Sequence, residues 1–486
     1  MSGFVSGKTK QAKLPVVIMA GGLGKRAREI SEDLPKPLIP IAGKPILEWE
    51  IECLVSQGYT EIILTVSYLA EKIMSYFGDG SAFGCHISYY EEKTPLGNAG
   101  ALFKLMESEA FSDYSDEDGN ADFLLLNADS MFDIDFDRFV AAHRRSGALA
   151  TLFVHPNNHP YDSGLILADE EGWVMSWLAK EDERPKYYKN LVNAGVHVLN
   201  TKALRVSGID AASVGEPVDG DSTDKVFKVD LDRQILKPLA SSVSGKKLMF
   251  AYASPEYVKD MGTPERFAQV QEDLESGLVQ ARNLSRPQKA VFLDRDGVIN
   301  KFNGFVRTPD TFELIPGVAE AIRKINDSGY LCIVITNQPV VARGEVTVPE
   351  LHTIFDKMET LLGEKGAYVD GIYYCPHHPD KGFEGEVVEL KIDCDCRKPK
   401  TGLLERAAAD YHIDLKQSIF VGDSWRDVAC GKSAGCTCIF LNGEFSETPH
   451  KSFEALEDEL AQKGFFGYNA DGIFDDLKSA ERVFYE

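Results

Sequence analysis

The sequence predicts an α/β protein built from two domains, and three observations predict it. Short apolar runs that fit strands alternate with amphipathic runs that fit helices, a pattern typical of parallel α/β sheets. The pattern stops once, at a polar stretch with a proline at residues 280–289, and then restarts. A chain of 486 residues is also too long for one ordinary hydrophobic core.

The first half contains its expected elements in order. Residues 14–19 predict a strand that leads into a glycine turn, and residues 46–57 have the apolar spacing of an amphipathic helix. Residues 61–66 and 123–126 predict further strands. Residues 112–120 are acidic and polar, and we expect an exposed loop there.

The second half repeats the class but not the motifs of the first. A helix expected over residues 264–280 precedes the break, and after it strands are expected over 290–293, 331–335 and 418–421. We expect a flexible tail at 1–12, a first domain at 13–276, a linker at 277–288, a second domain at 289–450 and a C-terminal extension at 451–486.

Composition limits the partners. The formal net charge of −24 argues against nucleic-acid or membrane binding, but a basic pocket for small anions remains compatible with it. The N-terminus has no apolar signal region, and nine cysteines is an odd number. We therefore expect a cytoplasmic protein with reduced thiols, small-molecule substrates and no nucleic-acid or membrane partner. Nothing in the sequence specifies an oligomeric state.

Glycines follow the first expected strand. Gly21, Gly22 and Gly24 lie between a strand and the next segment, where backbone N–H groups can approach phosphate oxygens, and Arg26 adds a forked cation. Lys36 stands between two prolines, whose stiff backbone can aim it at a phosphate. Taken alone, the glycine motif would indicate only a tight turn, and the Pro-Lys-Pro motif would more often be a surface loop.

Together these motifs resemble the signature of sugar-1-phosphate nucleotidylyltransferases, and further matches follow in order across most of residues 14–270. The resemblance implies a Rossmann-like nucleotide-diphospho-sugar transferase domain. It implies nucleotide contacts at Gly21, Gly22, Gly24, Gly97 and Asn98, sugar contacts at Asn193, Gly195 and Lys180, Mg²⁺ ligands at Asp129 and Asp260, and catalytic cations at Arg26 and Lys36. Lys180 is the nearest match to a degraded segment, and a solvated surface lysine is an equal alternative.

The implied reaction needs no general base. An oxygen of the sugar 1-phosphate, already an anion, attacks the α-phosphorus of a nucleoside triphosphate, and pyrophosphate leaves. Catalysis is then positioning and charge neutralisation by the two cations and by Mg²⁺, a hard ion that prefers carboxylate and phosphate oxygens.

Two aspartates end the first expected strand of the second half. Asp294 and Asp296 follow an apolar run and precede a glycine, an arrangement that suits Mg²⁺ and covalent chemistry. A calcium loop would carry more carboxylates. Thr336 ends another strand, Lys398 precedes a proline, and Asp423 ends a third strand.

This set resembles the haloacid dehalogenase superfamily of phosphatases. The resemblance implies a second Rossmann-like domain in which Asp294 is the nucleophile, Asp296 the general acid and base, Thr336 the phosphoryl contact and Lys398 the neutralising cation. Mg²⁺ would be held by Asp294, Asp296 and Asp423, with Asp427 behind them. Asn337, Arg343 and Arg397 are the implied substrate contacts, although Pro339 and Val340 depart from the family pattern.

A Cys-x-His pair and a Cys-x-Cys pair narrow the subfamily. Cys375, His377, Cys394 and Cys396 suit a tetrahedral structural Zn²⁺, with a disulfide or buried thiols as alternatives and His378 as the rival histidine. The pattern resembles small phosphatases that act on heptose bisphosphate or histidinol phosphate, in which a zinc-stapled loop replaces a large cap.

The combination predicts two consecutive reactions. Removing the 7-phosphate of a heptose 1,7-bisphosphate leaves a 1-phosphate that a transferase of the mannose- and heptose-1-phosphate guanylyl type can join to a nucleotide, with GTP favoured. The alternatives are a hexose-1-phosphate transferase fused to a phosphatase for histidinol phosphate or another sugar phosphate, or one inactive half that serves regulation or assembly.

Overall fold

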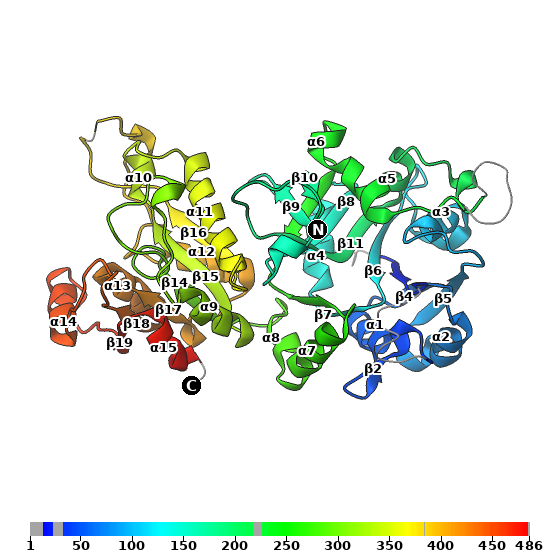
Figure 1. Ribbon diagram of the computed structural model, residues 1–486, viewed down its shortest axis with the longest axis horizontal. Helices are drawn as coiled ribbons and strands as arrows, with labels where there is room; N and C mark the ends of the chain where they lie inside the picture. Colours follow the sequence, from blue (N-terminus) through cyan, green and yellow to red (C-terminus); the bar gives the residue numbers. More distant parts are fainter. Residues whose placement is uncertain (1–12, 23–32, 217–225, 383, 485–486) are drawn as a thin grey trace, which may run out of the picture.

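The computed structural model describes residues 13–22, 33–216, 226–382 and 384–484. Arg26 and Gly24 lie outside these described residues. Figure 1 shows two α/β halves joined through α7 (Pro264–Glu275) and α8 (Leu278–Ala281).

The first half is built on a nine-stranded sheet. Its central strands run in the order β6-β1-β4-β5, and the pairs β1–β4, β1–β6 and β4–β5 are parallel. Its strands are β1 (Val16–Met19), β4 (Glu61–Val66), β5 (His86–Glu91), β6 (Asp122–Asn127), β8 (Ala150–His155), β9 (Leu165–Ala168), β10 (Val174–Leu178), β11 (Val192–Asn200) and β12 (Met249–Ala253).

The described residues of the first half also form two small strand pairs and several helices. The pair β7 (Ser130–Asp133) and β13 (Tyr257–Asp260) is antiparallel, as is the pair β2 (Pro40–Ile41) and β3 (Lys44–Pro45). The helices are α1 (Ile46–Ser56), α2 (Ala70–Phe77), α3 (Gly100–Glu107), α4 (Phe136–Ser146), α5 (Thr201–Val206) and α6 (Ser241–Ser244).

The second half is a six-stranded parallel sheet in the order β16-β15-β14-β17-β18-β19. Its strands are β14 (Ala290–Leu293), β15 (Leu331–Asn337), β16 (Gly371–Cys375), β17 (Ile419–Gly422), β18 (Thr437–Leu441) and β19 (Gly472–Phe474). Its helices are α9 (Val318–Asp327), α10 (Pro339–Ala342), α11 (Val348–Gly363), α12 (Gly402–Tyr411), α13 (Trp425–Ala434), α14 (Phe453–Gln462) and α15 (Leu477–Ala480).

The α/β expectation is confirmed, with two local differences. The helix expected over residues 264–280 is broken at Gly277, whose φ of 79° ends α7 before α8 begins. The segment after residue 451 supplies β19, which pairs with β18 at the edge of the second sheet.

The segment between the two sheets is packed rather than free. Arg282 is buried and its guanidinium lies 3.0 Å from Asp370 of the second half. The Asn283 side chain donates to Asp133 of the first half at 2.7 Å. The expected linker therefore contacts both halves directly.

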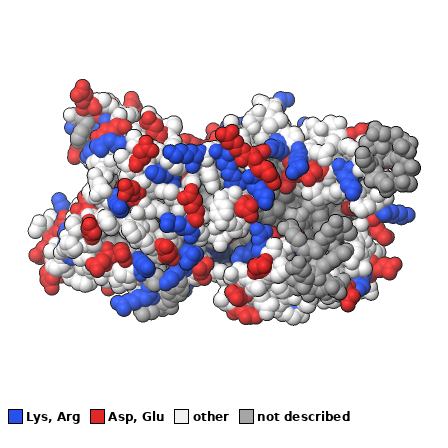
Figure 2. Space-filling view, viewed as in Figure 1, with Lys and Arg blue, Asp and Glu red and all other residues white. Residues whose placement is uncertain are grey.

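The surface mixes both signs of charge. Figure 2 shows Lys and Arg interspersed with Asp and Glu over both halves, so the described part of this face carries no broad basic field. Among the helices that the structure describes, none combines the length and hydropathy that crossing a bilayer needs.

Candidate active sites

The site of the second half lies at the carboxyl edge of its sheet. Asp294 follows β14, Thr336 lies at the end of β15, and Asp423 follows β17. Because β15, β14 and β17 are parallel neighbours, their ends meet at one edge, where ligands of open α/β sheets bind.

Lys398 lies among the carboxylates of this edge. Its Nζ atom is 2.9 Å from Asp294 Oδ1 and 2.6 Å from Asp427 Oδ1, and it donates to the Ile335 carbonyl at 2.9 Å. Burial lowers the pKa of Lys398, but Asp294 and Asp427 outweigh burial and raise it above its ordinary value. The lysine is therefore a fixed cation beside Asp294.

Three buried carboxylates gather at this edge of the sheet, and two of them, Asp294 and Asp427, pair with Lys398. Asp294, Asp423 and Asp427 offer oxygens that all lie within 4.8 Å of one another. Burial raises the pKa of Asp294 to about 6, against the attraction of Lys398, and burial and the two neighbouring carboxylates raise that of Asp423 well above its ordinary value. A divalent cation would relieve this repulsion, so the donor set fits Mg²⁺.

A glycine allows this close approach. Gly297 has a φ of 78°, and a Cβ built there would lie 1.9 Å from Asp423 Oδ2. Any side chain at this position would collide with the carboxylate, so the turn after Asp296 needs glycine.

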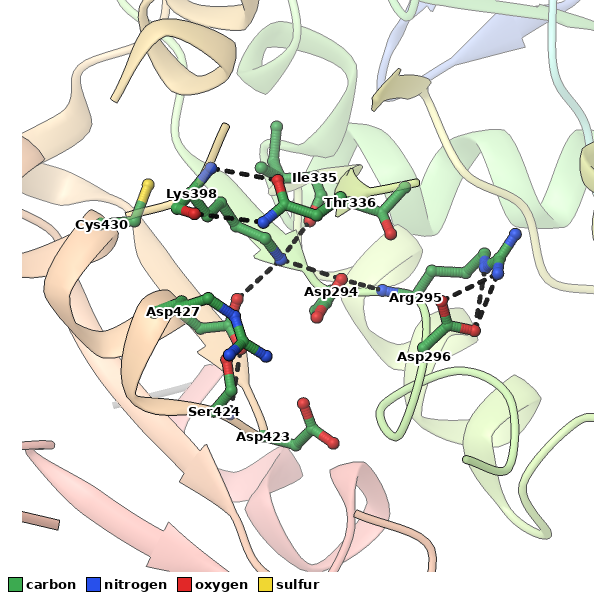
Figure 3. Close-up of polar contacts among 12 residues, drawn as sticks. Asp294, Arg295, Asp296, Ile335, Thr336, Lys398, Asp423, Ser424, Asp427 and Cys430 are labelled. Atoms are coloured by element: carbon green, nitrogen blue, oxygen red, sulfur yellow. Dashed lines mark hydrogen bonds and ion pairs between the residues drawn. The ribbon is translucent and has the colours of Figure 1, made fainter. Parts of the chain in front are cut away.

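Asp296 does not join the carboxylate cluster. Figure 3 shows its carboxylate turned from Asp294 toward Arg295, whose Nη2 atom lies 2.8 Å from both of its oxygens. The Gln338 amide donates to Asp296 Oδ2 at 3.1 Å and to the Thr336 hydroxyl at 2.9 Å. In this arrangement Asp427, rather than Asp296, supplies the third carboxylate.

The three expected substrate contacts of this half, Asn337, Arg397 and Arg343, each contact a different part of the protein. The Asn337 side chain donates to the Lys398 carbonyl at 3.2 Å and accepts from the Lys398 N–H at 3.0 Å, so it holds the backbone of that lysine. Arg397 donates to the His377 carbonyl at 3.2 Å. The Arg343 guanidinium stacks on the Phe305 ring at 4.8 Å.

Cys375, His377, Cys394 and Cys396 converge on one point. Their contacts run Cys375 Sγ–Cys394 Sγ 3.6 Å, Cys394 Sγ–Cys396 Sγ 3.3 Å and Cys396 Sγ–His377 Nδ1 3.3 Å. Ligands at tetrahedral angles around one zinc ion lie roughly 3.5–3.8 Å apart. The Cys375–Cys394 distance lies in that range and the other two are slightly shorter, so the four side chains are close enough together to hold one metal ion. The His378 Nδ1 atom instead accepts from the Asp380 N–H at 3.2 Å, outside the cluster.

The first half contains a cavity of about 530 Å³. Its lining joins the glycine turn after β1 to the ends of neighbouring strands and includes Gly21, Gly22, Lys36, Glu92, Gly97, Asn98, Asn127, Asp129 and Lys228. The Asn98 side chain accepts from the Leu231 N–H at 2.7 Å, which ties the turn at Gly97 to the segment after Lys228.

The two expected metal carboxylates lie on adjacent segments. The Met261 N–H donates to the Asp129 carbonyl at 2.9 Å, and Asp260 pairs with Ser130 in the β13–β7 ladder. The side chain of Asp129 forms an ion pair with Lys36. That of Asp260 accepts from Arg266 at 2.7 Å, and although burial raises the pKa of Asp260, Arg266 brings it below its ordinary value. Each carboxylate thus already faces a cation, as a metal ligand would.

Comparisons with known proteins agree with both halves. The nucleotidyl transferase family model matches residues 15–277, and the haloacid dehalogenase-like hydrolase model matches residues 246–435. The D-glycero-beta-D-manno-heptose-1,7-bisphosphate 7-phosphatase of Salmonella typhi is 41% identical over 151 residues, 31% of this chain and 78% of the relative. The D-glycero-alpha-D-manno-heptose-1,7-bisphosphate 7-phosphatase of Photorhabdus laumondii is 39% identical over 178 residues, 37% of this chain and 93% of the relative.

The chain belongs to the nucleotidyl transferase family and, in its second half, to the haloacid dehalogenase-like phosphatases. Among solved structures, HddC from Yersinia pseudotuberculosis is similar at 23% identity with a TM-score of 0.42, covering 54% of this chain and 100% of that one.

The three residues of the transferase half that are expected to contact the sugar do not lie together. Gly195 packs on the cavity residue Asn127, because a Cβ at Gly195 would lie 2.8 Å from Asn127 Nδ2. The Asn193 carboxamide oxygen lies 3.1 Å from His197 Nε2. Lys180 is exposed, lies 3.4 Å from Asp162 and does not line the cavity.

Sequence reasoning missed several residues that the structure brings to the sites. In the transferase half these are Glu92, whose pKa burial raises, and Lys228, which lines the cavity without a hydrogen bond or ion pair to the described residues. In the phosphatase half they are Arg295 and Gln338, which contact Asp296. An arginine between two aspartates at a strand end was the available signal for Arg295.

Proposed function

We propose that the phosphatase half removes the 7-phosphate of D-glycero-D-manno-heptose 1,7-bisphosphate and that the transferase half joins the resulting heptose 1-phosphate to a nucleoside triphosphate, with GTP favoured. The single observation that supports this most is the complete Asp294–Lys398–Asp423 site in a domain 41% identical to a heptose-bisphosphate 7-phosphatase, on the same chain as a nucleotidyl transferase. The two reactions are then consecutive, in the reverse of chain order.

In the phosphatase half, Asp294 Oδ attacks the phosphorus of the 7-phosphate and the sugar oxygen leaves. Asp296, turned away from Arg295 and protonated when the bisphosphate binds, donates that proton to the leaving oxygen and becomes a carboxylate. The carboxylate then accepts a proton from the water that hydrolyses the aspartyl phosphate and restores Asp294. Lys398 neutralises charge on the phosphoryl group throughout. Asp294, Asp423 and Asp427 would hold Mg²⁺, which supplies further charge neutralisation when bound.

In the transferase half, an oxygen of the sugar 1-phosphate attacks the α-phosphorus and pyrophosphate leaves. Lys36 holds the triphosphate side of the cavity, with Arg26 beyond the described residues, and Gly97 and Asn98 contact base and ribose. Asp129 and Asp260 would hold Mg²⁺, which neutralises phosphate charge when bound. Lys228 supplies an additional cation at the cavity wall.

The Cys₃His cluster is proposed to hold a structural Zn²⁺. Cys396 directly precedes Arg397 and Lys398. A loop ordered by the metal would therefore fix the position of the Lys398 backbone. Nine free cysteines, an odd number, also support the proposal of a cytoplasmic enzyme. The cavity of the transferase half supports small-molecule substrates.

The test of this function is a substrate panel on the intact chain. We expect pyrophosphate release from heptose 1-phosphate with GTP above the other three nucleoside triphosphates. Phosphate release from heptose 1,7-bisphosphate should disappear in Asp294→Asn. The transferase proposal is rejected if no sugar phosphate yields pyrophosphate with any nucleotide, and persisting phosphate release in the variant places the nucleophile elsewhere.

A further inference from the structure

The loop at residues 156–164, named the acceptor loop, joins β8 to β9 and lies against β11, the strand of the proposed sugar contacts. The Asn193 N–H donates to the Gly164 carbonyl at 3.3 Å, so the end of the loop lies against the start of β11. The charges of Arg266 and Asp260 also act on the ring of His159, and burial with Arg266 lowers the pKa of that imidazole. The backbone bond between Gly164 and Asn193 therefore places the loop beside the strand of the proposed sugar contacts.

The buried side chain of Asn190 holds the acceptor loop by two hydrogen bonds to the backbone of Asn157. Its side chain accepts from the Asn157 N–H at 3.1 Å and donates to the Asn157 carbonyl at 2.7 Å, and only 1% of Asn190 is exposed. Asn157 in turn donates to the Ser163 hydroxyl at 3.0 Å, and the His159 ring lies 3.1 Å from the same hydroxyl. Moving Asn190 would therefore move the whole loop.

The segment that carries Asn190 is held by the other half of the protein. The Thr360 hydroxyl of α11 accepts from the Tyr188 N–H at 3.0 Å and lies 3.2 Å from the Tyr188 carbonyl. Thr360 is buried, so these bonds are shielded from water. The carboxyl group of Glu359 accepts from the Asn190 backbone.

The same helix also touches the acceptor loop itself. A Cβ built on Gly363 would lie 2.7 Å from Pro160 Cγ and 3.2 Å from Pro160 Cδ. The last turn of α11 and the loop are therefore in direct contact, and a side chain at residue 363 would force one of them to shift.

We infer that helix α11 of the phosphatase half positions the acceptor loop of the transferase half, with Thr360 and Asn190 as positioning residues. The phosphatase domain then helps to shape the sugar-phosphate subsite of the transferase half. This rests on the proposed function, since it takes the acceptor loop to border the sugar phosphate. It also gives the fusion a physical consequence that does not depend on transfer of the intermediate between sites.

The first test compares two threonine variants of α11 in the full chain. Both hydroxyls donate to the carbonyl four residues earlier, Thr360 to Asp356 at 2.7 Å and Thr353 to Pro349 at 3.1 Å, but only Thr360 contacts the transferase half. Thr360→Val should raise the transferase KM for the sugar phosphate by on the order of 5-fold, with the KM for the nucleotide unchanged. Thr353→Val, at an exposed position, should leave both unchanged.

Gly363→Ala is a second variant that adds one methyl group against Pro160. Alanine favours the helix over glycine, so the fold is retained while the loop must move. The same selective rise in the sugar-phosphate KM is expected, and phosphatase turnover of the same sample reports that the chain is folded. Equal effects on both KM values, or none in either variant, would overturn the inference.

Arg138→Ala separates loop positioning from docking in general. Arg138 donates to the Asp410 carbonyl at 2.6 Å, another bond between the halves. We expect no change in the sugar-phosphate KM, and a rise equal to that of Thr360→Val would refute a loop-specific role. Failure of the proposed function looks different, because the wild-type chain would then release no pyrophosphate with any sugar phosphate.

Discussion

The Nζ atom of Lys398 lies 2.9 Å from Asp294 Oδ1, inside the parallel sheet edge of the phosphatase half. The same amine lies 2.6 Å from Asp427, and the Asn337 side chain holds its backbone. The lysine can therefore stabilise charge at Asp294 without first being moved into place.

Replacing this lysine should damage one activity and spare the other. Lys398→Met removes the cation, and we expect phosphatase kcat to fall by roughly 100- to 1,000-fold. Pyrophosphate release by the transferase half should change less than 2-fold, within ordinary assay scatter. Both are measured on one preparation, and phosphatase activity close to wild type would show that the charge of Lys398 is dispensable.

The cations of the transferase half can be ranked. Lys228 lines the cavity, whereas Lys180 is exposed and pairs with Asp162. Lys228→Met should lower kcat/KM for the sugar phosphate by about 10- to 100-fold, because it removes a charged contact, and Lys180→Met should have a smaller effect. Steady-state kinetics of the two variants test this ranking. A larger effect of Lys180→Met would identify Lys180 as the phosphate contact.

The four-ligand cluster predicts a metal stoichiometry. Cys394→Ser and Cys396→Ser should each lose about one zinc ion per chain and lower phosphatase activity, because the loop before Lys398 loses its order. Cys85→Ser, in the transferase half, is the matched control and should keep the metal. Elemental analysis after dialysis gives the answer, and unchanged zinc in the cluster variants would refute the site.

The buried carboxyl of Glu359 predicts a pH-dependent stability. Burial raises the pKa of Glu359 from 4.5 to about 8, so the folded chain keeps a proton that the unfolded chain releases. The stabilisation is complete below about pH 4.5 and is lost as the pH rises through about 8. Near pH 9, Glu359→Gln should therefore have a free energy of unfolding about 2–4 kcal/mol larger than that of wild type. Its unfolding temperature should be higher accordingly.

Thermal unfolding across this pH range checks the prediction. The exposed Glu364→Gln at the end of the same helix is the control and should follow wild type. Some pH dependence will remain in Glu359→Gln, because burial also raises the pKa of Asp356 to about 6. Parallel curves for wild type and Glu359→Gln would contradict the assignment.

Local patterns predicted the elements that place the sites. Strands expected over residues 61–66 and 290–293 are β4 and β14 to the residue, because buried runs bounded by turn signals have sharp limits. Asp294, Thr336 and Asp423 could be placed together from sequence, since each ends a parallel strand. Gly277 carried the signal that breaks the expected helix over residues 264–280.

Contacts between segments that are distant in the chain could not be predicted from the sequence. The direction of Asp296 depends on Gln338 of another strand end, and nothing local indicates that Arg295 is fully buried. Lys228 reaches the cavity only because its segment pairs with the turn at Gly97, through the Val229 N–H and the Leu96 carbonyl at 2.8 Å. The contact of α11 with the acceptor loop likewise exists only in the assembled fold.

The central claim is that the two halves act in sequence on one sugar. The most direct measurement follows phosphate and pyrophosphate separately when the intact chain and its Asp294→Asn variant receive heptose 1,7-bisphosphate and GTP. We expect both products from the wild type, neither from the variant, and restored pyrophosphate when the variant is given heptose 1-phosphate. Pyrophosphate from the variant with the bisphosphate would contradict the order of the two steps.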